Sequence, residues 1–202
     1  MKGDVYTIGF AGVLGTVCAL LLTGAATFTK PYAESNAKVE EIVNILSALG
    51  VPFEKGASAQ ELEKVYNQSV QEQQRGDLTL YAYSAPGGGV PKAFALRFSG
   101  PGLWGPIEGF LALEPDLKTI RAITFYHQEE TPGLGGEISA DWFKKQFVGK
   151  SIVDAAGQPG IRIGGPAGPN AVNAITGATL TCDKLQAILD GVVKELVEGT
   201  NG

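Results

Sequence analysis

Histidine, cysteine and clustered positive charge are scarce in this sequence, and each scarcity excludes a class of protein. The single histidine, His127, excludes a metal site built from two or more imidazoles. The two cysteines, Cys18 and Cys182, lie in an apolar run and near the far end of the chain, which argues against a disulfide framework. There is no Cys-x-x-Cys-His motif for a c-type haem. The net charge is −5 without a basic tract, whereas nucleic-acid binding needs clustered lysine and arginine.

Glycine, by contrast, is abundant: 28 of the 202 residues are glycine, about twice its usual share of roughly 7%. Because glycine lacks a Cβ atom, it serves tight turns and leaves room for the backbone to approach a ligand closely. The length allows one membrane anchor and one compact domain, since a domain takes roughly 100–200 residues. The composition therefore favours a domain whose glycine-rich loops lie close to something that it binds.

A long uncharged segment lies near the amino terminus. The residues from Val5 to Phe28 include no charged side chain, and a helix needs roughly 20 apolar residues to span a bilayer. A cleavable signal peptide is the alternative, but its apolar region usually has about 7–15 residues, and this run is longer. We therefore expect a retained transmembrane anchor, residues 1–30, which ends where Pro31 breaks the helix. The flanking charges nearly balance and give little guidance on orientation.

The rest of the chain has the pattern of an α+β domain, in which antiparallel strands are covered by helices. Apolar residues at helical spacing, with glycine stops, predict helices at 35–50, 60–74, 141–147 and 183–197. Short apolar runs between turn signals predict strands at 78–83, 93–98, 107–113 and 120–127. The Gly/Pro-rich stretch 157–170 is expected to be an irregular loop. Trp142, Phe143 and Phe147 are expected to be core residues.

One segment unlike ordinary scaffold is Glu-Glu-Thr-Pro-Gly-Leu-Gly-Gly, residues 129–136, directly after a predicted strand. It combines two carboxylates, a hydroxyl and three glycines. Such a loop can bring bare backbone N–H groups to a planar ligand or a phosphate. It can equally be a plain glycine-rich connection, and the residues of the loop alone leave both interpretations open.

A second such segment is Ile-Thr-Gly-Ala-Thr-Leu-Thr, residues 175–181, immediately before the last predicted helix. The small residues Gly177 and Ala178 leave the hydroxyl of Thr179 accessible. The start of a helix offers unpaired N–H groups and a partial positive charge, which together favour a phosphate. Alternatively, Thr179 or Thr181 caps the helix, which is the commoner role for threonine at such a position.

Taken together, three stretches carry a resemblance: residues 125–135, Phe-Tyr-His-Gln-Glu-Glu-Thr-Pro-Gly-Leu-Gly; residues 176–179, Thr-Gly-Ala-Thr; and residues 102–105, Gly-Leu-Trp-Gly. They resemble the signatures of the covalent FMN-binding domain family, over most of residues 95–195. The chain is similar to the flavin subunits of two related redox pumps. These are the C subunit of sodium-pumping NADH:quinone oxidoreductase and the G subunit of the Rnf ferredoxin:NAD oxidoreductase, and the short length favours the Rnf type.

The resemblance implies a role for each matching residue. In the family, the last threonine of Ser/Thr-Gly-Ala-Thr accepts FMN through a phosphoester, so Thr179 is expected to carry covalent FMN, attached by a separate flavin transferase. The other implied flavin contacts are Thr176, Gly177 and Ala178 of the motif, Thr131, Gly133 and Leu134 against the isoalloxazine ring, Leu103 and Trp104 as a further part of the pocket, and Lys150 toward flavin oxygens or phosphate. The family motif usually begins with Asp, where this chain has Asn173.

The implied function is electron relay between other membrane subunits of an ion-translocating oxidoreductase. The flavin supplies the redox chemistry, so no catalytic side chain is expected, and a single span without internal charge offers no ion path. His127, Glu129 and Glu130 can either tune the flavin potential or be solvated loop residues. The parts are then the anchor, a helical connecting segment at 31–75, and an FMN-binding domain at 76–202. By the same resemblance, the amino terminus lies inside and the domain on the extracytoplasmic side of the cytoplasmic membrane.

Two further functions stay open on the sequence. A stand-alone, membrane-tethered flavoprotein reductase requires an open pocket and activity without partners. A non-redox binding module anchored by one helix requires that Thr179 is only a helix cap, and it predicts a colourless protein.

Overall fold

The structure, a computed structural model, describes residues 2–54, 56–76, 78–85 and 88–199. By their internal contacts the residues form two compact units, Met1–Glu40 and Glu41–Gly202. The expected division into an anchor, a connecting segment and an FMN-binding domain, with boundaries at residues 30 and 75, separates the chain by function. It stays a prediction.

Helix α1 (Lys2–Leu49) is longer than the expected anchor and includes Pro31. The expected break at Pro31 is wrong, because a proline removes one intrahelical hydrogen bond and the apolar and helix-forming turns on both sides continue the helix. Within α1, the span Tyr6–Leu49 contains a stretch of mean hydropathy 2.0 with none of its surface buried. Among the described residues it is the one helix long and apolar enough to cross a membrane. Gly50, with φ of 69°, then ends the helix in the left-handed conformation.

The second unit is built on a five-stranded antiparallel sheet in the order β1-β2-β3-β4-β5. Its strands are β1 (Val70–Arg75), β2 (Leu78–Tyr83), β3 (Ala93–Pro101), β4 (Pro106–Leu113) and β5 (Ile120–His127). The four predicted strands are confirmed. The helix expected at 60–74 is only half right, because α2 (Ala59–Ser69) ends where β1 begins. Pairing of all six β1 residues with β2 outweighs the local preference of this polar edge segment.

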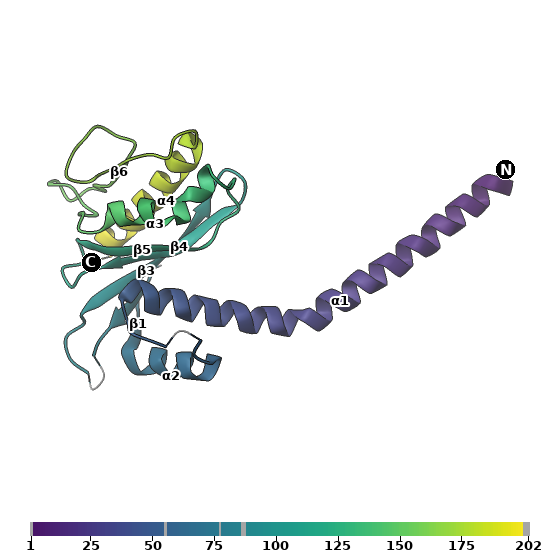
Figure 1. Cartoon of the computed structure of the whole chain (residues 1–202), viewed down its shortest axis with the longest axis horizontal. Helices are drawn as coiled ribbons and strands as arrows, with labels where there is room; N and C mark the ends of the chain where they lie inside the picture. The colour runs from purple at the N-terminus through teal and green to yellow at the C-terminus, as the bar shows by residue number, and fades with distance from the viewer. Residues whose placement is uncertain (1, 55, 77, 86–87, 200–202) are drawn as a thin grey trace. The chain divides into compact units, whose positions relative to one another are not determined.

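One face of the sheet is covered by the carboxyl-terminal half of the unit, as Figure 1 shows. The covering elements are α4 (Thr179–Glu198), α3 (Asp141–Lys144), and the 3₁₀ turns Gly135–Ser139 and Lys145–Phe147. The core on this face joins Leu96, Phe98 and Leu111 of the sheet to Phe143 and Leu185 of the helices. Burying this apolar surface is the main source of stability.

The other face carries a second buried layer. Ile45, Leu46 and Leu49 at the end of α1 are at most 2% exposed. On the sheet, the Phe110 ring contacts the ring of Tyr81 at 5.8 Å and that of Tyr126 at 5.4 Å between centroids. Both faces of the sheet are therefore covered.

Three expectations need correction in this half of the chain. Trp142 is 49% exposed, because α3 is a single turn that points only Phe143 inward, and the indole Nε1 donates to Glu137 Oε2 at 3.1 Å. The stretch 157–170 is not wholly irregular: β6 (Arg162–Ile163) pairs in parallel with β7 (Ala171–Val172). Helix α4 begins at Thr179, four residues before the expected start at 183.

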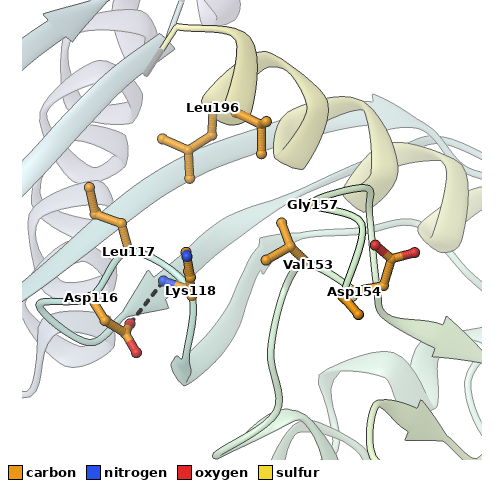
Figure 2. A pocket seen from close by; sticks show the side chains of 9 residues that line it. Asp116, Leu117, Lys118, Val153, Asp154, Gly157 and Leu196 are labelled. Carbon is orange, nitrogen blue, oxygen red and sulfur yellow. Dashed lines mark hydrogen bonds between the residues drawn. The ribbon is translucent and has the colours of Figure 1, made fainter. Parts of the chain in front are cut away.

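A hollow of about 480 Å³ lies at the carboxyl end of α4 (Figure 2). Its walls are the turn at Asp116–Lys118, the segment Val153–Gly157 and Leu196. The carboxylates there serve their own turns, since Asp116 accepts from the Lys118 and Thr119 amides at 2.8 Å and Asp154 accepts from Ala156 N at 2.8 Å. We therefore read the hollow as a gap between turns rather than as a site.

The Asp116 turn predicts a pH-dependent contribution to stability. Burial alone would raise the pKa of Asp116, but hydrogen bonds from Thr119 and Lys118 outweigh it and lower the pKa below its ordinary value. The carboxylate therefore stabilises the fold above the unfolded-state pKa of about 4, and this stabilisation is lost as the pH falls through the folded-state value. We expect Asp116→Asn to lower the free energy of unfolding by about 1 kcal/mol at pH 7, a value discounted for exposure. Urea unfolding in detergent at pH 7 and pH 3 tests this, and an equal loss at both would contradict it.

Candidate functional site

The site is organised around a buried carboxylate, Glu130, in the loop after β5. Glu130 is 4% exposed. Its Oε1 accepts from the backbone N–H groups of Leu103 at 2.7 Å and Trp104 at 3.1 Å. Its Oε2 accepts from Thr181 Oγ1 at 2.6 Å. One side chain thus joins the β3–β4 turn, the loop after β5 and the first turn of α4.

These three segments enclose a pocket of about 370 Å³, within the range of about 300–1,000 Å³ that small-molecule sites occupy. Large apolar side chains at its rim face solvent: Trp104 is 70% exposed, Leu180 59%, Leu103 44% and Leu134 42%. The pocket is lined by Leu103, Trp104, Glu130, Thr131, Leu134, Gly135, Gly177, Ala178, Thr179, Leu180 and Thr181. Clustered exposed apolar side chains of this kind mark surfaces that bind something.

Glycine is required at two points of the pocket wall. Gly177 has φ of 80°, a left-handed conformation that other residues adopt at a cost. At Gly135 a Cβ atom would lie 2.5 Å from Thr181 Oγ1 and 2.7 Å from Glu130 Oε2. No real Cβ fits at such distances, so the loop can approach the Glu130–Thr181 hydrogen bond only with glycine at 135.

The start of α4 carries the candidate anion-binding groups. Its cap residue is Ala178, which makes no side-chain cap hydrogen bond, and Thr179 is the first helical residue. The hydroxyl of Thr181 bonds to Glu130 instead. The interpretation that Thr179 or Thr181 caps the helix is therefore wrong. The N–H groups of the first helical turn have no partner within the helix, which favours an anion at this end.

Cys182 fixes the conformation of the loop before α4 through two hydrogen bonds. Its Sγ accepts from Ile175 N at 3.4 Å, and its own N–H donates to Ala178 O at 3.0 Å. Burial raises the pKa of the Cys182 thiol, so it stays neutral at pH 7 and packs as a small apolar group. Cys182 therefore shapes the loop and is not a reactive group.

The structure brings together seven of the sequence-predicted residues in the pocket lining: Leu103, Trp104, Thr131, Leu134, Gly177, Ala178 and Thr179. Gly133 and Thr176 adjoin it in the same two loops without lining it. Lys150 lies apart, and its Nζ donates to Pro169 O at 3.2 Å. The sequence did not single out Gly135, Leu180 or Thr181 as lining residues, although all three lie inside or beside its two motifs.

The three candidate tuning residues divide into two groups. His127 Nε2 lies 3.5 Å from Glu129 Oε1, and the two side chains are 46% and 59% exposed, as solvated loop residues would be. For Glu130 the solvated interpretation is wrong, because its carboxylate is buried. Among the residues that the structure describes, no group of three or more His, Cys, Asp or Glu side chains is placed to hold a metal ion.

Comparison with known proteins gives a family match that covers all the residues that line the pocket. Residues 102–194 match a family described as "FMN-binding domain". The chain is 30% identical over 214 residues to the C subunit of the Na(+)-translocating NADH-quinone reductase of Pasteurella multocida, a match that covers 84% of this chain and 82% of that protein. It is 43% identical over 111 residues to the corresponding protein of Yersinia pestis, and this match spans 53% of this chain and only 41% of that protein.

A solved structure shares the fold. The crystal structure of the C subunit of the Na(+)-translocating NADH-quinone reductase from Parabacteroides distasonis aligns with a TM-score of 0.70 at 24% identity, over 86% of this chain and 97% of that chain. The match to the Pasteurella protein runs over most of both sequences, and the matched domain contains every segment that lines the pocket. The chain therefore belongs to the family of C subunits of Na(+)-translocating NADH-quinone reductases and contains the FMN-binding domain of that family.

Proposed function

We propose that this chain carries FMN as a phosphoester on Thr179 and relays electrons as a subunit of a membrane-bound, sodium-translocating NADH:quinone reductase. The observation that carries the proposal is the difference between neighbouring hydroxyls. Thr179 is exposed at the start of α4 and lines the pocket, whereas Thr181 is 2% exposed and its hydroxyl is bonded to Glu130. Thr176 is exposed but outside the lining.

The residues of the pocket fit FMN in three respects. The volume of about 370 Å³ and the exposed apolar rim suit a flat organic ring. The amino end of the 20-residue helix α4 suits a phosphate. The hydroxyl of Thr179 stands at this end. Bound FMN supplies the uptake and release of electrons, and the chain supplies position and electrostatics.

The attachment itself is a phosphoryl-type transfer. Thr179 Oγ1 attacks the phosphorus of a flavin dinucleotide, forms the Oγ1–P bond and releases its proton to water. The bond from phosphorus to the departing nucleoside monophosphate breaks with its electron pair, so that no oxidant or reductant is consumed. A separate flavin transferase is the proposed catalyst, and the exposed positions 173, 174, 176, 177 and 179 give it access to the motif. Asn173 is one of these exposed residues.

A covalent tether has a physical purpose on the extracytoplasmic side of the cytoplasmic membrane, where a lost flavin is not readily replaced. The proposed orientation places the amino terminus inside, α1 across the bilayer and the domain outside, beside other membrane subunits. The names of the relatives favour the quinone-reducing pump over the Rnf type that the short length suggested. Glu130 is the one titratable side chain among the described lining residues, and we assign it no catalytic step.

The test of the attachment is denaturing electrophoresis of the chain purified from its own membranes. We expect a band that fluoresces as flavin under ultraviolet light after acid and detergent treatment. Flavin released into the supernatant instead would leave an FMN-binding protein without a covalent bond. A band and a supernatant that are both colourless would overturn the flavoprotein assignment and favour the anchored binding module.

The relay function is tested by mixing the isolated flavin-bearing chain with NADH and a quinone. We expect no turnover without the partner subunits and restored flavin reduction in whole membranes. Turnover by the isolated chain would instead indicate the stand-alone reductase.

A further inference from the structure

We propose that Glu130 is the positioning residue of the flavin pocket: its carboxylate holds the β3–β4 turn and the first turn of α4 against the loop after β5. The pocket is taken as a flavin site on the strength of the proposed function, but the role of Glu130 is argued from contacts of the chain alone. This positioning role differs from tuning of the flavin potential by an exposed charge, because the carboxylate acts through the three segments that it joins.

The contacts of Glu130 use both carboxylate oxygens. Oε1 receives two backbone N–H groups, from Leu103 and Trp104, and Oε2 receives the hydroxyl of Thr181. Charge-assisted hydrogen bonds of this kind are roughly twice as strong as neutral ones. The partners are 27, 26 and 51 residues away in sequence, so the bonds fix tertiary geometry rather than a local turn.

The surroundings exclude water from this carboxylate and so make its bonds obligatory. Glu130 is 4% exposed and Thr181 2%. Glycine allows the close packing, because a Cβ atom at Gly102 would lie 2.6 Å from Glu130 Oε1 and one at Gly135 would lie 2.7 Å from Oε2. The backbone N–H of Glu130 itself donates to Gln128 Oε1 at 2.8 Å. Removing the carboxylate would leave two part-buried amides and the buried hydroxyl of Thr181 without these partners, which is costly.

The consequence for the pocket is that its two apolar walls share one support. Leu103 and Trp104 form one side of the lining, and Thr179 and Leu180 form another. The backbone amides of Leu103 and Trp104 donate to Oε1 of Glu130. Thr179 and Leu180 directly precede Thr181, whose hydroxyl donates to Oε2. Loss of the carboxylate therefore frees both walls at once and lets the spacing between them vary.

The experiment measures amide hydrogen exchange at Leu103 and Trp104 in the full chain in detergent, without flavin. Glu130→Ala is compared with Glu130→Gln and with Glu129→Ala, whose side chain is exposed next door. We expect Glu130→Ala to speed exchange at both amides by about tenfold or more, with Leu96 and Leu111 of the sheet unchanged. Glu130→Gln restores most of the protection, because its amide oxygen accepts from both N–H groups and its NH₂ donates to Thr181. Glu129→Ala stays within about twofold of the natural chain.

A spectroscopic reading separates positioning from mere stability. In the flavin-loaded chain we expect Glu130→Ala to weaken the circular dichroism of the flavin bands, which depends on a fixed ring, while Glu130→Gln retains it. Unchanged exchange in Glu130→Ala, or an equal change in Glu129→Ala, overturns the proposal. If Glu130→Ala does not fold, Thr181→Val removes the donor at Oε2, and unaltered exchange at the Cys182 amide, which donates to Ala178 O, then overturns it. The exchange measurement needs no flavin, so a failure of the flavin assignment leaves this test intact.

Discussion

We expect a Thr179→Ala chain to carry no covalent flavin at all, because the substitution removes the one hydroxyl of the 176–181 segment that is exposed and lines the pocket at the start of α4. The first turn of α4 and the apolar rim remain in place, since Thr179 is not the cap of the helix. Intact mass measurement of the natural and Thr179→Ala chains, produced together with a flavin transferase, tests this expectation. The natural chain gains one FMN minus one water, and the variant gains nothing.

Two further variants decide between neighbouring hydroxyls. Thr179→Ser keeps a hydroxyl and should keep the flavin. Thr181→Val should also keep a mass gain, because the hydroxyl of Thr181 is bonded to Glu130 and is 2% exposed. A Thr79→Ala chain, altered on strand β2 far from the motif in sequence, controls for handling. A flavin that persists in Thr179→Ala and disappears in Thr181→Val would transfer the assignment to Thr181.

The second large effect concerns the helix that supports the pocket side of the sheet. Phe143→Ala should lower the free energy of unfolding by about 3–5 kcal/mol, a large part of a typical total of roughly 5–15 kcal/mol. Phe143 is fully buried and contacts the Phe147 ring at 5.4 Å between centroids. Its alanine variant therefore loses apolar burial, leaves a cavity and forfeits an aromatic pair.

Trp142 is the matched control, because it is the neighbouring aromatic residue and is 49% exposed. Trp142→Ala should cost about 1 kcal/mol or less, mainly the loss of its bond to Glu137 and of its partial burial. Urea unfolding followed by far-ultraviolet circular dichroism measures both. Equal losses for the two variants would contradict the burial pattern of this helix.

Much of the fold follows from local pattern, and the exceptions have identifiable causes. The strands at 78–83 and 120–127 are confirmed at both ends, because turn residues bound short apolar runs there. The strand at 70–75 was not predictable, since its polar side chains pair with β2 along a sheet edge and carry no alternating apolar pattern. The continuous helix through Pro31 depends on the turns on both sides of it, which outweigh one missing hydrogen bond.

The site shows the same division between local and tertiary information. The motifs at 129–136 and 176–179 pointed to two of the three segments that form the pocket, because their glycines and hydroxyl are visible in the sequence. The role of Glu130 was not visible, since a carboxylate next to Glu129 in a loop has no local sign of burial. Its partners Leu103 and Thr181 lie 27 and 51 residues away. Lys150 is the opposite case. The resemblance to the family suggested that it contacts the flavin, but in the structure its ammonium donates to the carbonyl oxygen of Pro169.

The most direct test of the central claim is tandem mass spectrometry of the peptide that contains residues 173–182, from chain purified out of its own membranes. We predict a mass gain of one FMN minus one water on that peptide, with fragment ions that place the gain on Thr179 and leave Thr176 and Thr181 unmodified. An unmodified peptide, or a gain placed on another residue, would contradict the claim that Thr179 bears the flavin.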